Sequence, residues 1–434
     1  MKKLLVVVVI LGAIFGLSPY FIGQQAEQKI RDIYGQMNTT PEFVFEVTEY
    51  NRGWFSSTAT IELKLDMGQI DPTMTDQMVF KMHNELEHGP ILTTTSGMEL
   101  GLVDFNTTLE LPEFITKELP ELNDALKDIF VIKSRMYFDG GSSGVSTMKA
   151  FDFTKEGVTI DVKEANMTAS TTSDGKMVVD GTWGGMSVSD SNTFGVTLGK
   201  TDFDFDLKAI DGNIYDINAI YTGDSSISMD EFRLSGAEIP GNVALTAITA
   251  TSSTTMDNDL MALDLNMGIG KIDAMGLSFS DFVFDQMFAN LDVPSLRKLN
   301  ELNRSINEQN LETKMEELKD VGLAMLAKKP EYMIKKLGVT TAQGEISSEA
   351  TVKINEEKFD INNPDSILLA IEADGSGYIP EPFLNAMGMG PMVAPFVEQG
   401  YLKKDGDNLV FEMSFKNGMP TLFGKPIPMG PPAQ

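Results

Sequence analysis

The chain has 434 residues, of which 42% are hydrophobic and 22% charged, with no Cys, two His and a formal net charge of −29. The absence of Cys excludes disulfides, zinc–thiolate sites and thiol nucleophiles. The acidic balance argues against nucleic acid as a partner, because nucleic acid binds basic surfaces. The two His leave almost no room for imidazole-based catalysis, and the ordinary hydrophobic fraction argues against wholesale disorder.

The N-terminus predicts a membrane anchor. Lys2 and Lys3 precede a run from Leu4 to Ile22 that contains no charged residue. A bilayer core needs about 20 apolar helical residues, and the two lysines would stay on the cytoplasmic side. The alternative is a cleaved signal peptide, which has a shorter apolar core and small residues before its cleavage site. This run stays bulky to its end, so we expect residues 1–23 to be an uncleaved single-pass anchor in a bacterial inner membrane, with the rest of the chain in the periplasm. The anchor residues include Leu4, Ile10, Phe15 and Ile22.

The body of the chain is typical of a mainly β (α+β) protein. Apolar residues at helical spacing predict a short amphipathic helix over 24–37, ended by Pro41. From Phe43 onward the period changes to two, which marks half-buried strands with one wet face. We therefore expect a long antiparallel β meander or open curved sheet. The clearest alternating segments are 43–47, 61–65, 80–87, 202–207 and 263–267.

Two helical interludes interrupt the strands. One is expected over 113–128, and a longer one begins at Asp292, a good N-cap, and is limited by Pro330. These boundaries predict an anchor (1–23), a β-meander domain (24–290), a helical insert (291–337) and a C-terminal segment (338–434) whose strands and short helix complete the sheet.

Two short motifs resemble a known family. The stretch Tyr50-Asn51-Arg52-Gly53-Trp54-Phe55-Ser56-Ser57 is similar to the Y-x-R-G-x-F-S-S element of the YdgA-like bacterial family, which is named for a domain of unknown function. His88-Gly89-Pro90 resembles the HGP element of the same family. The Gly-Ser-Ser stretch after Tyr137 and the closing hairpin, 400–418, fit as well. The resemblance implies an inner-membrane-anchored protein with its bulk in the periplasm, and it implies no established reaction. The signature residues are Tyr50, Arg52, Gly53, Phe55, Ser56, Ser57, His88, Gly89 and Pro90.

The signature residues have structural and chemical interpretations. Arg52 and Gly53 lie between two expected strands, so a hairpin turn is the first interpretation, with Arg52 paired to an acid or capping carbonyls; binding of an anionic ligand by Arg52 is the alternative. Ser56 and Ser57 lack the G-x-S-x-G context of hydrolase nucleophiles. We expect His88, at the end of a strand, to be partly buried and hydrogen-bonded.

Three clusters contain side chains that can ligate a metal, and each cluster also has a structural explanation. His83 with Glu85 and Glu87 shares the wet face of one strand. Asp202, Asp204 and Asp206 share a strand face at a spacing of about 7 Å, too far apart to hold one calcium ion without other loops. Met387, Met389 and Met392 offer thioethers that suit copper(I), but also suit the filling of a core. We expect no metal and no cofactor.

Three functions remain open. The first is a non-enzymatic envelope scaffold or assembly factor, as a homo-oligomer or with a partner, in which the helix over 292–328 covers the apolar face of the sheet. The alternative is a protein that binds or transfers a lipid or another hydrophobic ligand on that face. An enzyme is least favoured, since it needs converging polar residues in a pocket. An open apolar face would favour the ligand and a covered one the scaffold.

Overall fold

The structure is a computed structural model. It describes residues 2–38, 43–66, 77–94, 97–110, 112, 117, 129–190, 194–211, 214, 219–237, 241–305 and 311–427, with the side chains of residues 2–17 left aside. The expectation of a mainly β fold with few helices is confirmed. The chain forms two compact units, one of residues 1–189 and 200–221, the other of residues 190–199 and 222–434. The helix expected over 113–128 lies outside the described residues, apart from Lys117.

The first unit is built on an antiparallel sheet. Its strands pair in the order β1–β2–β3–β6–β7–β8–β11–β12–β15, so most neighbours in the sequence are also neighbours in the sheet. The bounds are β1 Phe43–Arg52, β2 Ser56–Asp66, β3 Gln77–His88, β6 Val103–Glu110, β7 Phe130–Met136, β8 Ser142–Met148, β11 Ala165–Thr171, β12 Lys176–Trp183 and β15 Thr201–Asp211. Shorter strands are β4 Ile91–Thr94, β5 Gly97–Leu100, β9 Phe151–Lys155, β10 Val158–Val162 and β13 Met186–Asp190; β4 pairs with β5, and β9 with β10.

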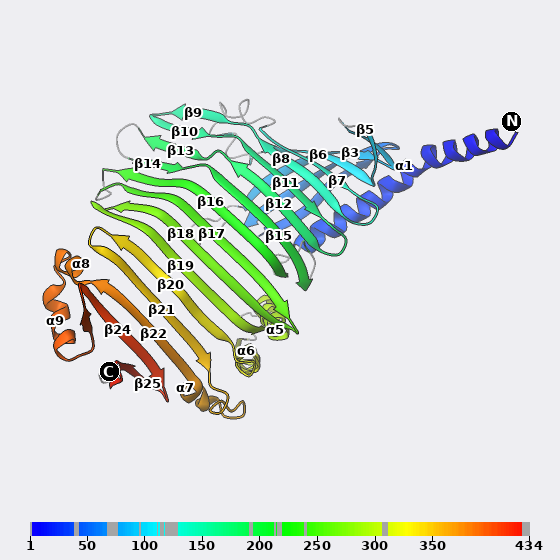
Figure 1. Cartoon of the computed structure of the whole chain (residues 1–434). Coiled ribbons are helices and arrows are strands. Elements are labelled where there is room, and N and C mark those ends of the chain that lie inside the picture. Colours follow the sequence, from blue (N-terminus) through cyan, green and yellow to red (C-terminus); the bar gives the residue numbers. More distant parts are fainter. Residues whose placement is uncertain are drawn as a thin grey trace. The chain divides into compact units, whose positions relative to one another are not determined.

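One helix runs along this sheet. The sequence predicts an anchor followed by a separate helix over 24–37, but the structure has a single helix, α1 Lys2–Met37, with Pro19 inside it. Figure 1 shows α1 lying against the sheet and continuing beyond it toward the N-terminus. Its C-terminal half contributes Ile22, Ala26 and Ile30 to the core of the unit, where they meet residues from β2, β3, β6 and β7. The core residues from the sheet side are Ala59, Ile61, Leu86, Leu102, Val103 and Met136.

The expected anchor falls mostly on residues 1–17, whose side chains lie outside the described part of the chain. Within the described part, no helix combines the length and the apolar character needed to cross a bilayer.

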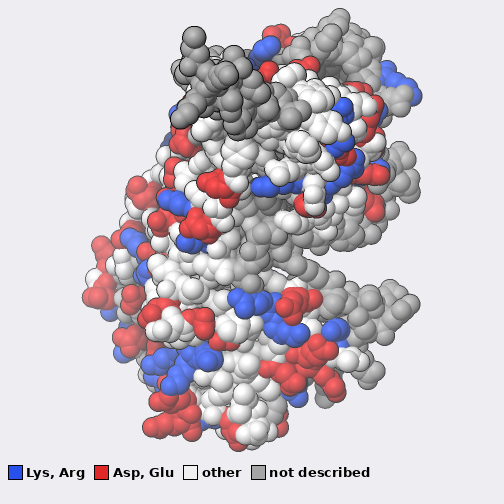
Figure 2. All heavy atoms as spheres, turned by 90° about the vertical axis from the view of Figure 1, so that its right-hand side faces the viewer, with Lys and Arg blue, Asp and Glu red and all other residues white. Residues whose placement is uncertain are grey.

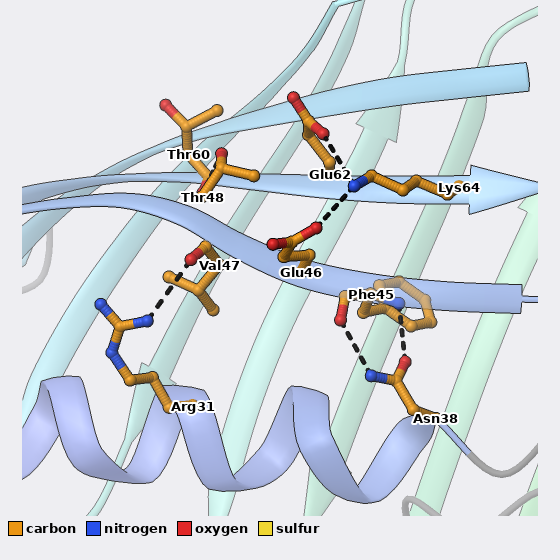
Figure 3. A network of polar contacts seen from close by, with 9 residues as sticks. All are labelled: Arg31, Asn38, Phe45, Glu46, Val47, Thr48, Thr60, Glu62 and Lys64. Carbon is orange, nitrogen blue, oxygen red and sulfur yellow. Dashed lines mark hydrogen bonds and ion pairs between the residues drawn. The ribbon is translucent and has the colours of Figure 1, made fainter.

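The end of α1 also occupies the edge of β1, as Figure 3 shows. The side-chain amide of Asn38 donates to the carbonyl of Phe45 at 2.9 Å, and the Phe45 N–H donates to Asn38 Oδ1 at 2.6 Å. About two turns earlier, Arg31 Nη1 donates to the Val47 carbonyl at 3.3 Å. An edge strand exposes unpaired backbone groups that recruit other strands. The helix end satisfies several of these groups on β1.

The second unit is a further antiparallel meander, with the pairing order β14–β16–β17–β18–β19–β20–β21–β22–β24–β25–β26 and β23 on β24. Its first strands are β14 Phe194–Leu198, β16 Ile220–Gly236, β17 Val243–Asp257, β18 Leu260–Ala274 and β19 Leu277–Asp292. The later strands are β20 Glu331–Thr341, β21 Gly344–Ile354, β22 Ile371–Pro380, β23 Lys403–Asp405, β24 Asn408–Lys416, β25 Met419–Leu422 and β26 Lys425–Pro426. Strand β20 starts earlier than residue 338, where the sequence predicted that strands resume.

The helices of the second unit lie between its strands in the sequence. They are α5 Val293–Ser305, α6 Leu311–Leu326, the 3-10 turn η1 Pro364–Ser366, α7 Ile367–Ala370, α8 Glu381–Ala386 and α9 Gly390–Glu398. Asp292 caps α5 as expected: its Oδ2 accepts from the Ser295 N–H at 3.0 Å. The first of these helices contacts the end of β19, and α6 packs on α5. The helical insert therefore appears as two described helices, with residues 306–310 outside the described part.

Candidate functional site

The signature residues meet at one end of the first unit. Tyr50 and Arg52 close β1, Gly53 to Phe55 form the turn, and Ser56 opens β2. The Gly53 N–H donates to the Ser56 carbonyl at 2.8 Å, which closes the turn. At the end of β3 the His88 N–H donates to the Phe55 carbonyl at 2.8 Å. The two motifs, separated in the sequence, thus form one junction.

His88 and Ser57 form a buried pair at this junction. The Nε2 of His88 lies 2.8 Å from Ser57 Oγ, and the two residues are 5% and 4% exposed. The other ring nitrogen, Nδ1, lies 3.3 Å from the Trp54 carbonyl oxygen. A carbonyl oxygen can only accept, so Nδ1 carries the proton of the neutral ring and Nε2 accepts from the Ser57 hydroxyl. Both ring nitrogens are therefore used within the protein.

The environment of His88 favours its neutral form. Burial lowers the pKa of the imidazole below its ordinary value, and the positive charge of Arg52 acts in the same direction. The carbonyls of Trp54 and Pro19 oppose this shift, but burial outweighs them. Burial likewise raises the pKa of the neighbouring Tyr50 phenol. A hydroxyl as enclosed as that of Ser57 is poorly placed to attack a substrate from solvent, so the pair fits a structural contact better than a catalytic dyad.

Helix α1 contacts this pair at Gly23, a residue to which the sequence analysis assigns no role in the site. A Cβ built on Gly23 would lie 2.2 Å from Cε1 of His88 and 2.6 Å from its Nδ1. The Tyr50 hydroxyl donates to the Gly23 carbonyl at 3.4 Å. Only the missing side chain lets the helix backbone approach the imidazole this closely. The available signal was the spacing of Ile22, Ala26 and Ile30, which puts Gly23 beside the buried stripe of the helix.

Arg52 also contacts α1. Its Nη1 lies 3.6 Å from Glu27 Oε2, and its guanidinium sits 5.2 Å from the centre of the Tyr20 ring. The Tyr20 ring in turn lies 5.3 Å from the Trp54 ring. The sequence offered an acid or an anionic ligand as the partner of Arg52. The structure supplies an acid and an aromatic ring, both from the helix.

Gly89 and Pro90 lead from this junction into the β4–β5 hairpin. The Gly89–Pro90 peptide is cis, and the Gly89 N–H donates to the Leu102 carbonyl at 2.9 Å. A Cβ on Gly89 would lie 1.8 Å from the Gly101 carbonyl oxygen, so glycine is required by this close approach. The signature glycines therefore serve backbone contacts.

A buried arginine that the sequence did not predict supports the same region. Arg135 on β7 is 8% exposed and binds both carboxylate oxygens of Asp104, at 2.6 and 2.7 Å. It also pairs with Glu99 of the β4–β5 hairpin. The hydrogen bonds to Asp104 are the main reason that the pKa of Arg135 is raised. This fork holds the β4–β5 hairpin to the sheet.

The second unit has a separate feature, a sheet face with an apolar central row. The strand register places Ile227, Ala250, Met267, Phe284 and Leu337 side by side in one row across β16–β20. Ile227, Met267 and Leu337 are 43%, 46% and 37% exposed. Adjacent rows on the same face contain the polar residues Ser252, Thr254 and Gln286, and they add from β18, β19 and β20 the hydrophobic residues Leu263, Leu265, Phe288, Tyr332 and Ile334. We call the ten hydrophobic residues of these rows the apolar face.

One row on the opposite side of the same strands is polar. The row next to Met267 contains Thr251, Asn266, Asp285 and Lys336. Strands with one polar and one apolar side normally have the apolar side covered. Here α5 contacts the end of β19 and α6 contacts α5, while three residues of the central row remain more than one-third exposed.

The remaining candidate clusters do not converge. His83 Nε2 lies 2.7 Å from Glu110 on the exposed side of the sheet, so Glu110 is its described partner rather than Glu85 or Glu87. Asp202 pairs with Lys200 and Asp206 with Lys176, while Asp204 lies between them on β15. Within the described ranges no group of His, Cys, Asp and Glu is placed to hold a metal ion. Met387, Met389 and Met392 are all exposed around the α8–α9 connection.

Charge is mixed on the surface. Figure 2 shows Lys and Arg interspersed with Asp and Glu on the face it presents, rather than gathered into a field of one sign. The ion pairs of the first unit include Lys64 with Glu46 and Lys163 with Asp161. The surplus of acid does not create an obvious cation site on this face.

The comparisons with known proteins add the family and no activity. No curated protein and no solved structure matches the chain. Residues 1–430 match a family model described as a bacterial protein of unknown function (DUF945), which is compatible with the YdgA-like resemblance. Because this match spans nearly the whole sequence, the chain belongs to the DUF945 family of bacterial proteins of unknown function.

Proposed function

We propose that this chain is a membrane-tethered envelope protein that carries a hydrophobic ligand, such as the acyl chains of a lipid, on the apolar face of its second unit. It performs no chemistry of its own. The observation that supports this most is the exposure of Ile227, Met267 and Leu337 in the middle of a continuous apolar row. Contiguous apolar surface of this kind marks a binding surface in soluble domains.

The energetics favour an apolar occupant. Each buried methylene contributes about 0.8 kcal/mol, so an acyl chain laid along several strands gains a useful affinity without any directed polar contact. The flexible thioether side chain of Met267 can adapt to acyl chains of differing shape. Phe284 and Phe288 add apolar area beside it. The polar row with Asn266 and Asp285 keeps the back of the same strands wet. A two-sided sheet of this type needs no pocket of fixed shape.

The proposed tether is α1. The run from Leu4 to Ile22 carries no charge and follows Lys2 and Lys3, and its last residue, Ile22, already packs in the core of the first unit. The same helix continues without a break into the Gly23–His88 contact, so a span there would be fixed to the first unit. We propose one span of a bacterial inner membrane, with the C-terminal bulk in the periplasm.

A scaffold is the second candidate. The same exposed row would then be covered by a protein partner or by a second copy of the chain, since apolar area of this size also drives protein association. It shares with the first candidate the tether and the absence of chemistry. What separates the two is the occupant of the apolar face.

A photo-crosslinker on β18 distinguishes the occupants. A benzophenone amino acid replaces Met267 on the apolar face, and the matched control replaces Asn266, the next residue, on the polar side. We expect lipid adducts, read by mass spectrometry of the full chain in its native membrane, from position 267 and not from 266. Protein adducts at 267 without lipid would favour the scaffold. Lipid adducts of equal yield at both positions would contradict a specific apolar face.

A further inference from the structure

A second exposed hydrophobic surface lies where α1 leaves the first unit. Four aromatic residues surround this point: Tyr20 and Phe21 on the helix, and Trp54 and Phe55 in the β1–β2 turn. Their exposed fractions are 37%, 60%, 47% and 61%. They are one group, because the Tyr20 ring lies 5.8 Å from Phe21 and 5.3 Å from Trp54. We call these four residues the aromatic collar.

The β4–β5 hairpin adds aliphatic residues beside the collar. Its register puts Ile91 opposite Leu100, and Met98 opposite Thr93, on one face. Ile91, Leu100 and Met98 are 41%, 69% and 77% exposed, whereas the opposite face buries Leu92 at 1%. The hairpin begins three residues after His88, which is hydrogen-bonded to the collar at the Phe55 carbonyl. The base of the β4–β5 hairpin therefore lies at the same end of the unit as the collar.

We propose that the aromatic collar and the exposed residues Ile91, Met98 and Leu100 of strands β4 and β5 rest in the headgroup region of the bilayer that α1 enters, as further membrane contacts beside the tether. The proposal rests on the tether put forward above. Tyr20 and Phe21 lie at the C-terminal end of the uncharged run from Leu4 to Ile22. Trp and Tyr prefer the membrane interface, because their rings are apolar and their N–H or O–H groups stay hydrated.

The contacts of Arg52 fit the same position. Its charge is paired with Glu27 and stacked on Tyr20, so the collar presents aromatic rings around a compensated ion pair. A net charge of −29 would repel anionic headgroups, so contact at this point has to come from apolar insertion rather than from a basic patch. With the collar and these residues of β4 and β5 inserted, the first unit would be held at a fixed angle to the bilayer, because His88 and Gly23 lock the helix to the sheet.

The two tryptophans of the chain allow a direct test. Trp54 lies in the collar and Trp183 on β12. The Nε1 of Trp183 is buried without a hydrogen-bond partner, so Trp183→Phe removes an unsatisfied donor and leaves Trp54 as the one fluorophore. The full-length Trp183→Phe protein is reconstituted in phosphatidylethanolamine/phosphatidylglycerol vesicles, with and without brominated acyl chains. We expect brominated lipid to remove most of the Trp54 emission, while the matched Trp54→Phe protein keeps its Trp183 emission.

The absence of Cys permits a second reporter on the hairpin. Met98→Cys carries an environment-sensitive dye at an exposed position of β5, and Val158→Cys carries it on β10, which Figure 1 shows away from α1 in the same unit. In the same vesicles, the dye at position 98 is expected to shift its emission to the blue, and the dye at position 158 is not.

Vesicle flotation separates the failure of this inference from the failure of the tether. Protein that floats with the vesicles but shows neither quenching of Trp54 nor a shift at position 98 would overturn the membrane contact of the collar and leave the tether intact. Protein that does not float would overturn both. Quenching of Trp54 with flotation supports the inference.

Discussion

The backbone of Gly23 in helix α1 packs directly against the imidazole of His88. A Cβ built on Gly23 would lie 2.2 Å from the Cε1 atom of His88. The ring is held from its other sides by the Ser57 hydroxyl and the Trp54 carbonyl. One histidine thus joins the helix, the β1–β2 turn and the end of β3. The position of the proposed tether relative to the sheet depends on this contact.

Gly23→Ala should destabilise the first unit. The added methyl overlaps the imidazole, and overpacking of this kind costs about 1–3 kcal/mol. Both tryptophans lie in the first unit, so urea unfolding followed by Trp fluorescence reports its free energy of unfolding. Gly35→Ala is the matched control in the same helix, because nothing lies within 4 Å of a Cβ there. It should stabilise by about 0.5–1 kcal/mol through helix propensity. Equal effects of the two substitutions would argue against the Gly23–His88 contact.

The stability of the first unit should fall as the pH is lowered through the ordinary pKa of histidine, 6.5. The pKa of His88 is lower in the folded chain than in the unfolded chain, so the unfolded state binds the proton first. The stabilisation is therefore complete above 6.5 and is lost progressively below it. The urea midpoint measured from about pH 8 to about pH 5.5 checks this. His88→Gln should flatten the dependence in that window, and His83→Gln, which changes the other histidine, should leave it in place.

Arg135→Ala should be severely destabilising. The guanidinium is 8% exposed and binds both oxygens of Asp104, so its removal leaves a carboxylate without its counter-charge and costs about 3 kcal/mol. Lys163→Ala is the comparison within the same unit. Lys163 pairs with Asp161 at the surface, where such pairs contribute about 0–1 kcal/mol. Urea unfolding by Trp fluorescence measures both. Similar costs for the two variants would contradict the structural role of Arg135.

Asn38→Ala should loosen the edge of β1. Its amide makes a reciprocal pair of hydrogen bonds with the backbone of Phe45, which replaces a neighbouring strand. Hydrogen exchange with mass spectrometry should show faster exchange in peptides that contain Phe45 and Val47. Asn51→Ala, which removes only the amide contact with Glu49, should leave those peptides unchanged. Unchanged exchange in Asn38→Ala would show that α1 does not protect this edge.

The alternation of apolar and polar residues was enough to predict the sheet. Phe203, Phe205 and Leu207 alternate with acids, and they form part of β15 as such a period requires. Asp292 was readable as an N-cap because the capping interaction is local. Antiparallel pairing of successive strands also follows from short turns, so the meander was accessible from the sequence.

The contacts at the junction were not accessible from the sequence. The two motifs contain Ser57 and His88, but the sequence does not show that these residues meet. The 2.8 Å distance between Ser57 Oγ and His88 Nε2 depends on the register of the strands. In the sequence, Gly23 marks the end of the expected anchor. Pro19 usually breaks or kinks a helix, so the sequence does not predict that α1 continues through it. Arg135 on β7 pairs with Asp104, which lies opposite it on the adjacent strand β6. The sequence of a strand does not by itself show whether a charged side chain on it is buried.

The most direct test of the proposed function is native mass spectrometry of the full chain released from its membrane in mild detergent, followed by organic extraction of whatever it carries. Met267→Asp places a charge on the apolar face, and Asn266→Asp places it on the polar side of the same strand. The proposed function predicts lipid at fixed stoichiometry on the unmodified chain and on Asn266→Asp, and its loss from Met267→Asp. A chain that carries no lipid, or a Met267→Asp variant that keeps it in full, would contradict that function.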